Sequence, residues 1–515
     1  MSDQDKNVCS RFRQSLFDPK DFTLTFELVP SRGGQGKAHN RTLEFARQAA
    51  ADGRLHAVSI TENAGGHPAL SPGTLGTEIR SMGLEVIVHL SCKDKNRNQM
   101  ESLLFGWDRK DLFNLLVIAG DYPQQGYRGH PKPVFDLDTI QALDLISRLN
   151  CEQAGRDRRN PAVKPYKPTV FLKGVAVSPF KILESELLMQ YFKLHRKAAA
   201  GADYVITQLG YDARKFHEVL QYMQLNNLNL PILGNVFVPN LPVVEIMRQG
   251  GIPGCVMPDD LYALIRQEAE SEDKGKKARL IRAAKLLSVL KGIGYDGAHI
   301  GGPGLSFADF DFILSEAAQM AGSWPDYVEE LSYWPENGFY YYKKDEKTGL
   351  NLAELNAKGK KAVISGAYYV ARAAHELMFA ENGLLFVPAQ KICLKLADSK
   401  LSSTLASVEH LIKFISFNCQ NCGDCTLAEL AFLCPQSGCA KYLLNGACGG
   451  SRDGWCEVYP GRKRCLYVKV YERLKSIGRE QEMKEGFVPP RDWSLNKTSS
   501  WINFYQGRDH TDKNK

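Results

Sequence analysis

The sequence predicts an α/β protein that begins with a (β/α)8 TIM barrel and continues into a small cysteine-rich α+β domain. Between Phe22 and about Ile300, short segments rich in branched apolar residues alternate with longer amphipathic ones. This alternation is typical of repeated βα units around a parallel sheet. Eight of the 13 cysteines lie within the last hundred residues. Such clustering indicates a separate unit that binds metal or an iron-sulfur cluster.

Eight segments are predicted strands: Phe22–Val29, His56–Thr61, Glu85–Leu90, Asn114–Ala119, Lys173–Val177, Tyr204–Thr207, Ile232–Phe237 and Gly297–Ile300. Between them, apolar residues at three- and four-residue spacing predict helices, among them Leu43–Ala50, Thr139–Leu149, Ser185–Ala200 and Ala278–Leu290. Eight repeats over about 280 residues match a closed barrel, typically ~250 residues long. An open doubly wound sheet is the alternative, but no G-x-G-x-x-G follows the first strand.

Three parts are expected along the chain: a barrel at 1–315, a bridging helical and aromatic segment at 316–400, and the cysteine-rich domain with a polar tail at 401–515. Helices are expected at Ala367–Phe379 and Leu401–Phe417. The tail from Gly486 onward is polar, and we expect it to be partly disordered.

Composition narrows the class of protein. The formal net charge of +7 is mild for 515 residues and its lysines and arginines are spread along the chain, so nucleic-acid binding gains little support. No run of about 18 apolar residues occurs, and the polar N-terminus lacks a secretory signal. We therefore expect a cytoplasmic protein without membrane insertion. In that reducing compartment, clustered cysteines indicate ligands rather than disulfides.

Polar residues stand where several predicted strands end, which is where barrel enzymes place their catalytic side chains. The candidates are Glu27 in F-E-L-V-P-S-R, Thr61 in S-I-T-E-N, His89 in V-H-L-S-C, and Gly120 and Asp121 in A-G-D-Y-P. Lys197 and Gln208 lie in H-R-K-A-A-A-G-A-D-Y-V-I-T-Q. Taken singly, each has an ordinary structural explanation: a salt bridge, a hydrogen-bonded histidine or a solvated helix lysine.

In this chain order, the five motifs resemble the methylenetetrahydrofolate reductase family over roughly residues 20–310. The resemblance implies a barrel that holds a flavin noncovalently, FMN with FAD as the alternative, and passes hydride to methylenetetrahydrofolate, giving methyltetrahydrofolate. Opening the substrate's ring requires a proton donor. By position, Glu27 matches the family's general acid, and Asp121 matches the catalytic aspartate that contacts both flavin and folate.

The remaining positions match residues that line the same site. Thr61, His89, Gly120 and Lys197 match flavin-binding positions, and Gln208 matches a substrate-binding one. The chain departs from the family at Ala119 and Ser178, and the aromatic residue that stacks on nicotinamide or folate falls near Met247. These departures make NADH the less expected donor.

The cysteines Cys419, Cys422 and Cys425 are spaced C-x-x-C-x-x-C, with Cys434-Pro435 further on. Three close thiolates and a later Cys-Pro are typical of 4Fe-4S ligation, although the usual gap is shorter, and tetrahedral zinc is the alternative. With Cys439, Cys448, Cys456 and Cys465, the eight residues could fill one or two metal sites.

About residues 400–476 resemble the C-terminal domain that accompanies such reductases in anaerobic one-carbon metabolism (the Wood-Ljungdahl pathway), where it is linked to iron-sulfur electron transfer. The resemblance implies a ferredoxin or a larger redox complex as electron donor. Three alternatives stay open: an NADH-dependent reductase with a structural zinc domain, a non-catalytic electron-transfer or assembly subunit, and a different folate-dependent reaction. A homo-oligomer is also left open.

Overall fold

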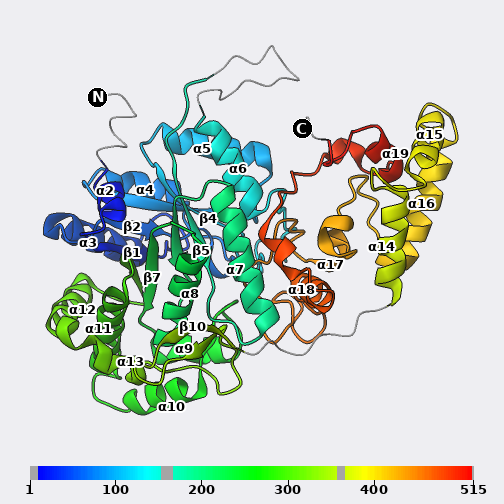
Figure 1. Ribbon diagram of the computed structural model, residues 1–515. Coiled ribbons are helices and arrows are strands. Elements are labelled where there is room, and N and C mark those ends of the chain that lie inside the picture. Colours follow the sequence, from blue (N-terminus) through cyan, green and yellow to red (C-terminus); the bar gives the residue numbers. More distant parts are fainter. Residues whose placement is uncertain (1–9, 152–165, 357–365, 513–515) are drawn as a thin grey trace.

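Eight parallel strands close into a barrel in the computed structural model, which describes residues 10–151, 166–356 and 366–512 (Figure 1). The strands are β1 (Thr23–Leu28), β2 (Ala57–Ile60), β3 (Glu85–Ser91), β4 (Asn114–Ile118), β5 (Leu172–Val177), β6 (Tyr204–Thr207), β7 (Ile232–Phe237) and β8 (Gly297–Gly301). β1 pairs with β8, with Thr23 opposite Gly297, and this pairing closes the barrel. The predicted fold class is confirmed, and each predicted strand is present.

Helices surround the strands: α3 (Lys37–Asp52), α4 (Pro72–Arg80), α5 (Arg97–Asp108), α6 (Thr139–Leu149), α7 (Glu184–Ala199), α8 (Ala213–Leu225), α9 (Leu241–Arg248), α10 (Asp259–Glu268), α11 (Lys276–Ile293) and α12 (Phe307–Met320). The apolar faces of most of these helices pack on the outer faces of the strands in one large core, whereas α9 and α10 bury theirs in a smaller separate cluster. At the other end of the barrel, the N-terminal helix α2 (Arg11–Phe17) inserts Phe12 and Leu16 among the inward side chains of the strands. The barrel interior is thus a packed core that is open only at the carboxyl ends of the strands.

The first half of the expected bridging segment packs on the barrel. It contains η2 (Ala321–Asp326), α13 (Tyr327–Glu330) and a hairpin of β9 (Tyr342–Lys344) and β10 (Asn351–Leu355). The Tyr341 amide donates to Glu218 on α8, and the Arg214 guanidinium lies 3.7 Å from the centre of the Tyr340 ring. These contacts tie the aromatic stretch to α8.

Helices α14 (Gly366–Met378), α15 (Phe386–Ala397) and α16 (Ser402–Phe417) project beside the cysteine-rich region, at the right of Figure 1. After them come η3 (Ala428–Leu430), α17 (Pro435–Gly438), α18 (Leu466–Ser476), η4 (Glu480–Lys484), η5 (Trp493–Leu495) and α19 (Ser500–Tyr505). The described residues from 366 to 512 contain helices and isolated β-bridges but no strand, so this region is helical rather than α+β. No helix within the described ranges is long and apolar enough to cross a membrane.

The polar tail is ordered through residue 512, which corrects the expectation of disorder there. Asn503 and Asp509 are buried, and His510 Nδ1 lies 2.6 Å from an Asp424 carboxylate oxygen in the cysteine-bearing loop. The tail therefore folds back over the cysteines because its polar groups find buried partners there.

The cysteine-rich region docks on the barrel through buried polar contacts. Asp138 caps α6 with one carboxylate oxygen and accepts the Leu444 and Asn445 amides with the other, at 3.0 and 2.7 Å. Lys193 on α7 donates to the Ala447 carbonyl at 3.0 Å, and Lys181 donates to that of Ser451 at 2.8 Å. Each contact joins residues about 250 to 300 positions apart, so two parts of the sequence form one continuous structure.

Candidate active site

A cavity of about 440 Å³ lies at the open end of the barrel, where the strands end. It contains every catalytic, flavin-binding and substrate-binding candidate taken from the sequence: Glu27, Thr61, His89, Gly120, Asp121, Lys197 and Gln208. Segments up to 180 residues apart contribute these side chains, because the carboxyl ends of parallel barrel strands meet on one face. The roles of the individual residues stay predictions.

Glu27 on β1 lies beside His299 of the neighbouring strand β8. Its Oε2 lies 3.7 Å from Nε2 of His299, whose Nδ1 lies 2.8 Å from the Thr25 hydroxyl. Burial raises the pKa of Glu27, but the hydrogen bond and charge of His299, with a smaller contribution from His89, outweigh it, and the net pKa is lowered. The carboxyl is therefore ionised at neutral pH until something in the cavity changes its surroundings. His299 was not among the residues chosen from the sequence, although it ends a strand as they do.

His89 is a neutral side chain in this site. Its Nε2 lies 2.7 Å from the Ser59 hydroxyl. Burial lowers its pKa to about 4, and the carboxylate of Glu27 opposes that shift only in part. A neutral imidazole can donate from one nitrogen and accept at the other, so His89 can orient a polar ring without adding charge.

The Gly120–Asp121 turn has a fixed geometry. Gly120 has φ +83°, and a Cβ there would lie 2.9 Å from the Ser91 Cβ, so only glycine fits. Asp121 Oδ2 accepts the Gly65 amide at 2.7 Å. The turn holds a carboxylate at the rim of the cavity, as the family resemblance implies.

Helix α7 contributes the buried amine of Lys197. Burial lowers its pKa well below the usual value, with a smaller contribution from Lys193, and its Nζ donates to the Ala176 carbonyl. The ordinary alternative, a solvated helix lysine, is therefore wrong. Gln208 uses its Oε1 to accept the Leu209 amide at 3.0 Å, which leaves its amide nitrogen for the cavity.

Several buried polar atoms that border the cavity have no hydrogen-bond partner in the described protein: Thr61 Oγ1, Ser178 Oγ, Gln190 Nε2 and Asn235 Oδ1. Buried polar groups are normally paired, and an unpaired one costs free energy. This mixture of donors and acceptors is suited to a flat, polar heterocycle such as a flavin. Ser178, which departs from the family pattern, is thus placed to take part.

The cysteine-rich domain supplies part of the cavity wall, which sequence reasoning missed. Lys441, Ala447, Cys448, Gly449, Gly450 and Glu457 all line it. Lys441 donates to the Gly120 carbonyl at 2.7 Å and forms an ion pair with Glu457. At Gly450 a Cβ would overlap the Glu457 carboxylate. The adjacent glycines after Cys448 were the available signal, since paired glycines often mark a close backbone approach.

The position predicted to correspond to the stacking aromatic residue, Met247, lies away from the cavity in this structure. Met247 is fully buried in a separate cluster with Val244 and Leu261. Phe237, at the end of β7, lines the cavity instead. An aromatic ring is therefore present at the site, and the departure at Met247 no longer argues against NADH.

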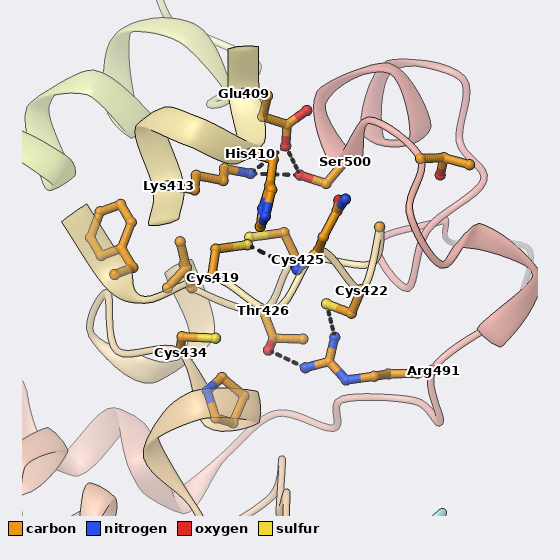
Figure 2. A pocket seen from close by; sticks show the side chains of 16 residues that line it. Glu409, His410, Lys413, Cys419, Cys422, Cys425, Thr426, Cys434, Arg491 and Ser500 are labelled. Atoms are coloured by element: carbon orange, nitrogen blue, oxygen red, sulfur yellow. Dashed lines mark hydrogen bonds and ion pairs between the residues drawn. The ribbon is translucent and has the colours of Figure 1, made fainter. Parts of the chain in front are cut away.

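The cysteines form two groups. Cys419, Cys422, Cys425 and Cys434, the outer set, lie around a small cavity of about 30 Å³ beneath α16 (Figure 2). Arg491 Nη1 approaches Cys422 Sγ at 2.9 Å, and Lys413 is held by Glu409 and Ser500 at 2.7 and 2.6 Å. Burial raises the pKa of the Cys422 thiol to about 11, against the opposing charge of Arg491. Arg491 thus places a positive charge against a thiol of the outer set, whereas the charge of Lys413 is already shared with Glu409.

The inner set is Cys439, Cys448, Cys456 and Cys465, and Cys448 lines the cavity at the barrel mouth. Burial raises the pKa of Cys448 to about 12, and Glu457 adds to it. Burial raises the pKa of Cys465 and of Cys439, and other thiols of the set add to it: Cys448 and Cys439 for Cys465, and Cys456 for Cys439. Through Cys448, the inner set reaches the cavity that contains the catalytic candidates.

A barrel with a polar cavity at the ends of its strands, walled on one side by a cysteine-rich domain, is an architecture suited to a cofactor-dependent barrel enzyme. Residues 11–298 match the family model described as methylenetetrahydrofolate reductase, and residues 399–494 match the one described as methylene-tetrahydrofolate reductase C terminal. The first match covers more than half of the chain. The chain belongs to the methylenetetrahydrofolate reductase family.

Curated relatives are distant. The chain is 24% identical over 184 residues to methylenetetrahydrofolate reductase 2 of Saccharomyces cerevisiae, covering 35% of this chain and 28% of the yeast protein. It is 21% identical to methylenetetrahydrofolate reductase (NADH) 1 of Arabidopsis thaliana, covering 47% and 40%. With 5,10-methylenetetrahydrofolate reductase of Buchnera aphidicola it shares 19% identity, covering 42% and 65%. The chain thus spans less than two thirds of the length of these relatives.

Among solved structures, an uncharacterized protein from Clostridium thermocellum, whose title says that it binds two copies of 5-methyl-5,6,7,8-tetrahydrofolic acid, superposes with a TM-score of 0.41 and 14% identity. The superposition covers 60% of this chain and 99% of that one.

Proposed function

We propose that this chain is an oxidoreductase that reduces methylenetetrahydrofolate to methyltetrahydrofolate with a noncovalently bound flavin, FMN or FAD, and that electrons enter through the cysteine-rich domain. The observation that carries the proposal is that one cavity is lined by two groups of residues. The strand-end residues that match the family form one part of its wall, and Cys448 of the C-terminal domain belongs to another. Family membership supports the reaction, and the geometry supports the electron entry.

A flavin in this cavity would supply the hydride that the substrate's methylene group receives. The chain's own residues would hold it: Thr61, His89, Gln190 and Asn235 offer unpaired or neutral polar atoms, and the Gly120–Asp121 turn lies at the rim. Asp121 and Gln208 would contact the folate. These residues orient two flat ring systems and exclude water from the space between them.

Glu27 would hold the proton that the departing ring nitrogen needs. Since His299 lowers the pKa of Glu27, the carboxylate is ionised before the ligands arrive. Filling the cavity removes water and raises the free-energy cost of the charge on Glu27, which favours the protonated carboxylic acid. Glu27 can then deliver its proton to the substrate.

The two cysteine sets fit iron-sulfur clusters better than zinc. Tetrahedral zinc with thiolates at ~2.3 Å requires sulfur atoms about 3.8 Å apart. Among the described residues, no three cysteine sulfurs lie within 4.8 Å of one another. That arrangement does not favour a compact zinc site, and the C-x-x-C-x-x-C run with its later Cys-Pro supports a 4Fe-4S cluster at the outer set.

Anaerobic purification followed by rapid mixing tests the proposal. The protein should contain flavin and iron with little zinc. Reduced ferredoxin or reduced viologen should bleach the flavin rapidly and NADH slowly, and methylenetetrahydrofolate should then restore its absorbance. Rapid stoichiometric bleaching by NADH, in protein that contains zinc and no iron, would establish the NADH-dependent alternative. Protein without flavin would support the non-catalytic subunit. A reduced flavin that methylenetetrahydrofolate does not reoxidise would support another one-carbon reaction.

A further inference from the structure

A second cavity, of about 470 Å³, lies on the outer side of the barrel helix α7. None of its lining residues belongs to the cavity at the barrel mouth. Its wall combines Arg196 of α7 with residues of α14, of the η3 turn and of the segment around η4. It therefore lies where the barrel, the projecting helices and the cysteine-rich region meet.

Arg196 is a buried cation that lacks a partner in the described protein. The residue is 7% exposed, and its Nε has no hydrogen-bond acceptor. Burial lowers its pKa, and only the more distant Tyr467 and Asp138 oppose that effect. A guanidinium stays charged throughout the physiological range. An unpaired buried charge is costly, so natural proteins rarely keep one that nothing neutralises.

The other two arginines of this cavity are already paired. Arg372 pairs with Glu376 at 2.7 Å, and Arg479 Nη2 pairs with Glu482 at 2.8 Å. Of the remaining carboxylates, Glu429 lies with Oε1 3.2 Å from His510 Nε2 while its buried Oε2 has no partner in the described protein, and Glu485 is exposed to solvent. Arg196 is therefore the cation of this cavity whose charge is unmatched, and it faces the backbone near Gly486, where a Cβ would lie 4.0 Å from its Nη2.

We propose that this cavity binds the oxyanion of a small organic phosphate or carboxylate, with Arg196 as its principal ligand. The planar guanidinium donates two parallel hydrogen bonds to a carboxylate or phosphate. Tyr368, Phe432 and Phe487 provide an apolar wall for the rest of the molecule. The volume is within the range of small-molecule sites.

Such a ligand would connect two parts of the molecule. Arg196 belongs to the barrel, whereas Phe432 follows η3, between Cys425 and Cys434 of the outer set. Binding should therefore stabilise the docked arrangement of the cysteine-rich region on the barrel, because only that arrangement assembles the site.

Thermal unfolding of the intact, anaerobically purified protein tests this site. Three probes are added at constant ionic strength, with chloride as reference: inorganic phosphate, citrate and adenosine monophosphate. The variants are Arg196→Met, which keeps length and removes charge, and Arg282→Met as the matched control. Arg282 is also a largely buried guanidinium on a barrel helix, but it already pairs with Glu268.

In the parent protein and in Arg282→Met, at least one probe should raise the melting temperature by several degrees. In Arg196→Met that rise should be lost. Without probe, Arg196→Met should melt at or above the parent temperature because it removes an uncompensated charge, whereas Arg282→Met should melt lower because Glu268 loses its partner. The probe that acts identifies the ligand as phosphate or carboxylate. An equal response in the parent and in Arg196→Met, or no response to any probe, would overturn the proposal.

Discussion

At the scale of single residues, the candidate active-site cavity is lined by buried polar side chains, several of which have no partner in the described protein. Leaving such groups unpaired costs folding free energy unless a ligand binds them. Neutral His89, ionised Glu27 and the unpaired hydroxyls of Thr61 and Ser178 share one space. Each is held by the barrel rather than by its neighbours in the sequence. A bound heterocycle would satisfy them together, which explains why one cavity contains so many.

Replacing Glu27 with Gln should slow methylenetetrahydrofolate reduction by about 10²-fold or more, because the amide keeps the shape and removes the transferable proton. Flavin content and donor-driven bleaching should stay within twofold of the parent. Glu62→Gln is the control, since Glu62 lines the same cavity but its carboxylate is occupied by Lys95 at 2.7 Å. Single-turnover reoxidation of the flavin by substrate separates the two, and a Glu27 variant as fast as the control would exclude the acid role.

The half-buried histidine of α7, His195, predicts a pH dependence of stability. Burial, with help from Lys484, lowers its pKa to about 4. The unfolded chain binds a proton near pH 6.5 and the folded chain does not, so folding free energy is lost as pH falls from about 6.5 toward 4. Partial exposure limits the loss to about 1 to 3 kcal/mol. In His195→Gln, denaturant unfolding should depend less on pH over that window, and an unchanged slope would contradict the assignment.

At the scale of elements, the barrel and the cysteine-rich region are stabilised differently. Barrel helices bury an apolar face against strands, whereas the cysteine-bearing loops from 418 to 434 include several left-handed residues, among them Asn418, Asn421 and Gly423. Within these loops, Asp424 is held by polar contacts, since its carbonyl accepts from Arg491 and its carboxylate accepts the His510 amide of the tail. Such loops gain much of their order from a bound metal group.

Replacing Cys422 or Cys425 with Ser should therefore remove about one cluster's worth of iron and loosen this region, while the barrel still binds flavin. Cys393→Ser is the matched control, since Cys393 is a buried thiol of α15 that packs against Tyr505 rather than facing either set. Metal analysis and proteolysis of the purified variants measure both effects. Unchanged metal in both Cys422→Ser and Cys425→Ser would exclude the outer set as ligands.

At the scale of the molecule, the cysteine-rich region forms part of the wall of the candidate active site. Lys441 contacts Gly120 and Glu457, and Gly254 of the barrel lies so close to Gly449 that a Cβ would approach its carbonyl to 2.7 Å. The candidate active-site cavity and the domain interface are therefore one structure, and changes at the interface should alter the binding of the proposed flavin.

Lys441→Met should weaken flavin binding by about tenfold or more, since it releases the Gly120 carbonyl and leaves Glu457 buried without its partner. Lys463→Met is the control, because Lys463 also donates to a backbone carbonyl of this domain, that of Ser437, but lies outside the cavity. Fluorescence titration of flavin-depleted protein gives both dissociation constants. Equal flavin affinities in the two variants would show that Lys441 does not position the turn.

The sequence by itself determined the barrel and most of the candidate site. Strand positions followed from local apolar patterning, and Glu27, His89 and Asp121 followed from their places at strand ends, because the barrel topology brings every strand end to one face. These features depend on short-range periodicity, which a single sequence records. His299 obeyed the same rule and was overlooked, although its strand was predicted.

Only the tertiary structure decided what lies opposite those strand ends. Contacts between segments far apart in sequence determine four of these features. They are the approach of Cys448 to the barrel mouth, the division of eight cysteines into two sets, the ordered tail and the unpaired Arg196. Asp138 illustrates the reason: it reads locally as a helix cap, yet its second oxygen fixes residues 444 and 445. Local pattern specifies an element, but the partner of each buried polar group is chosen by packing.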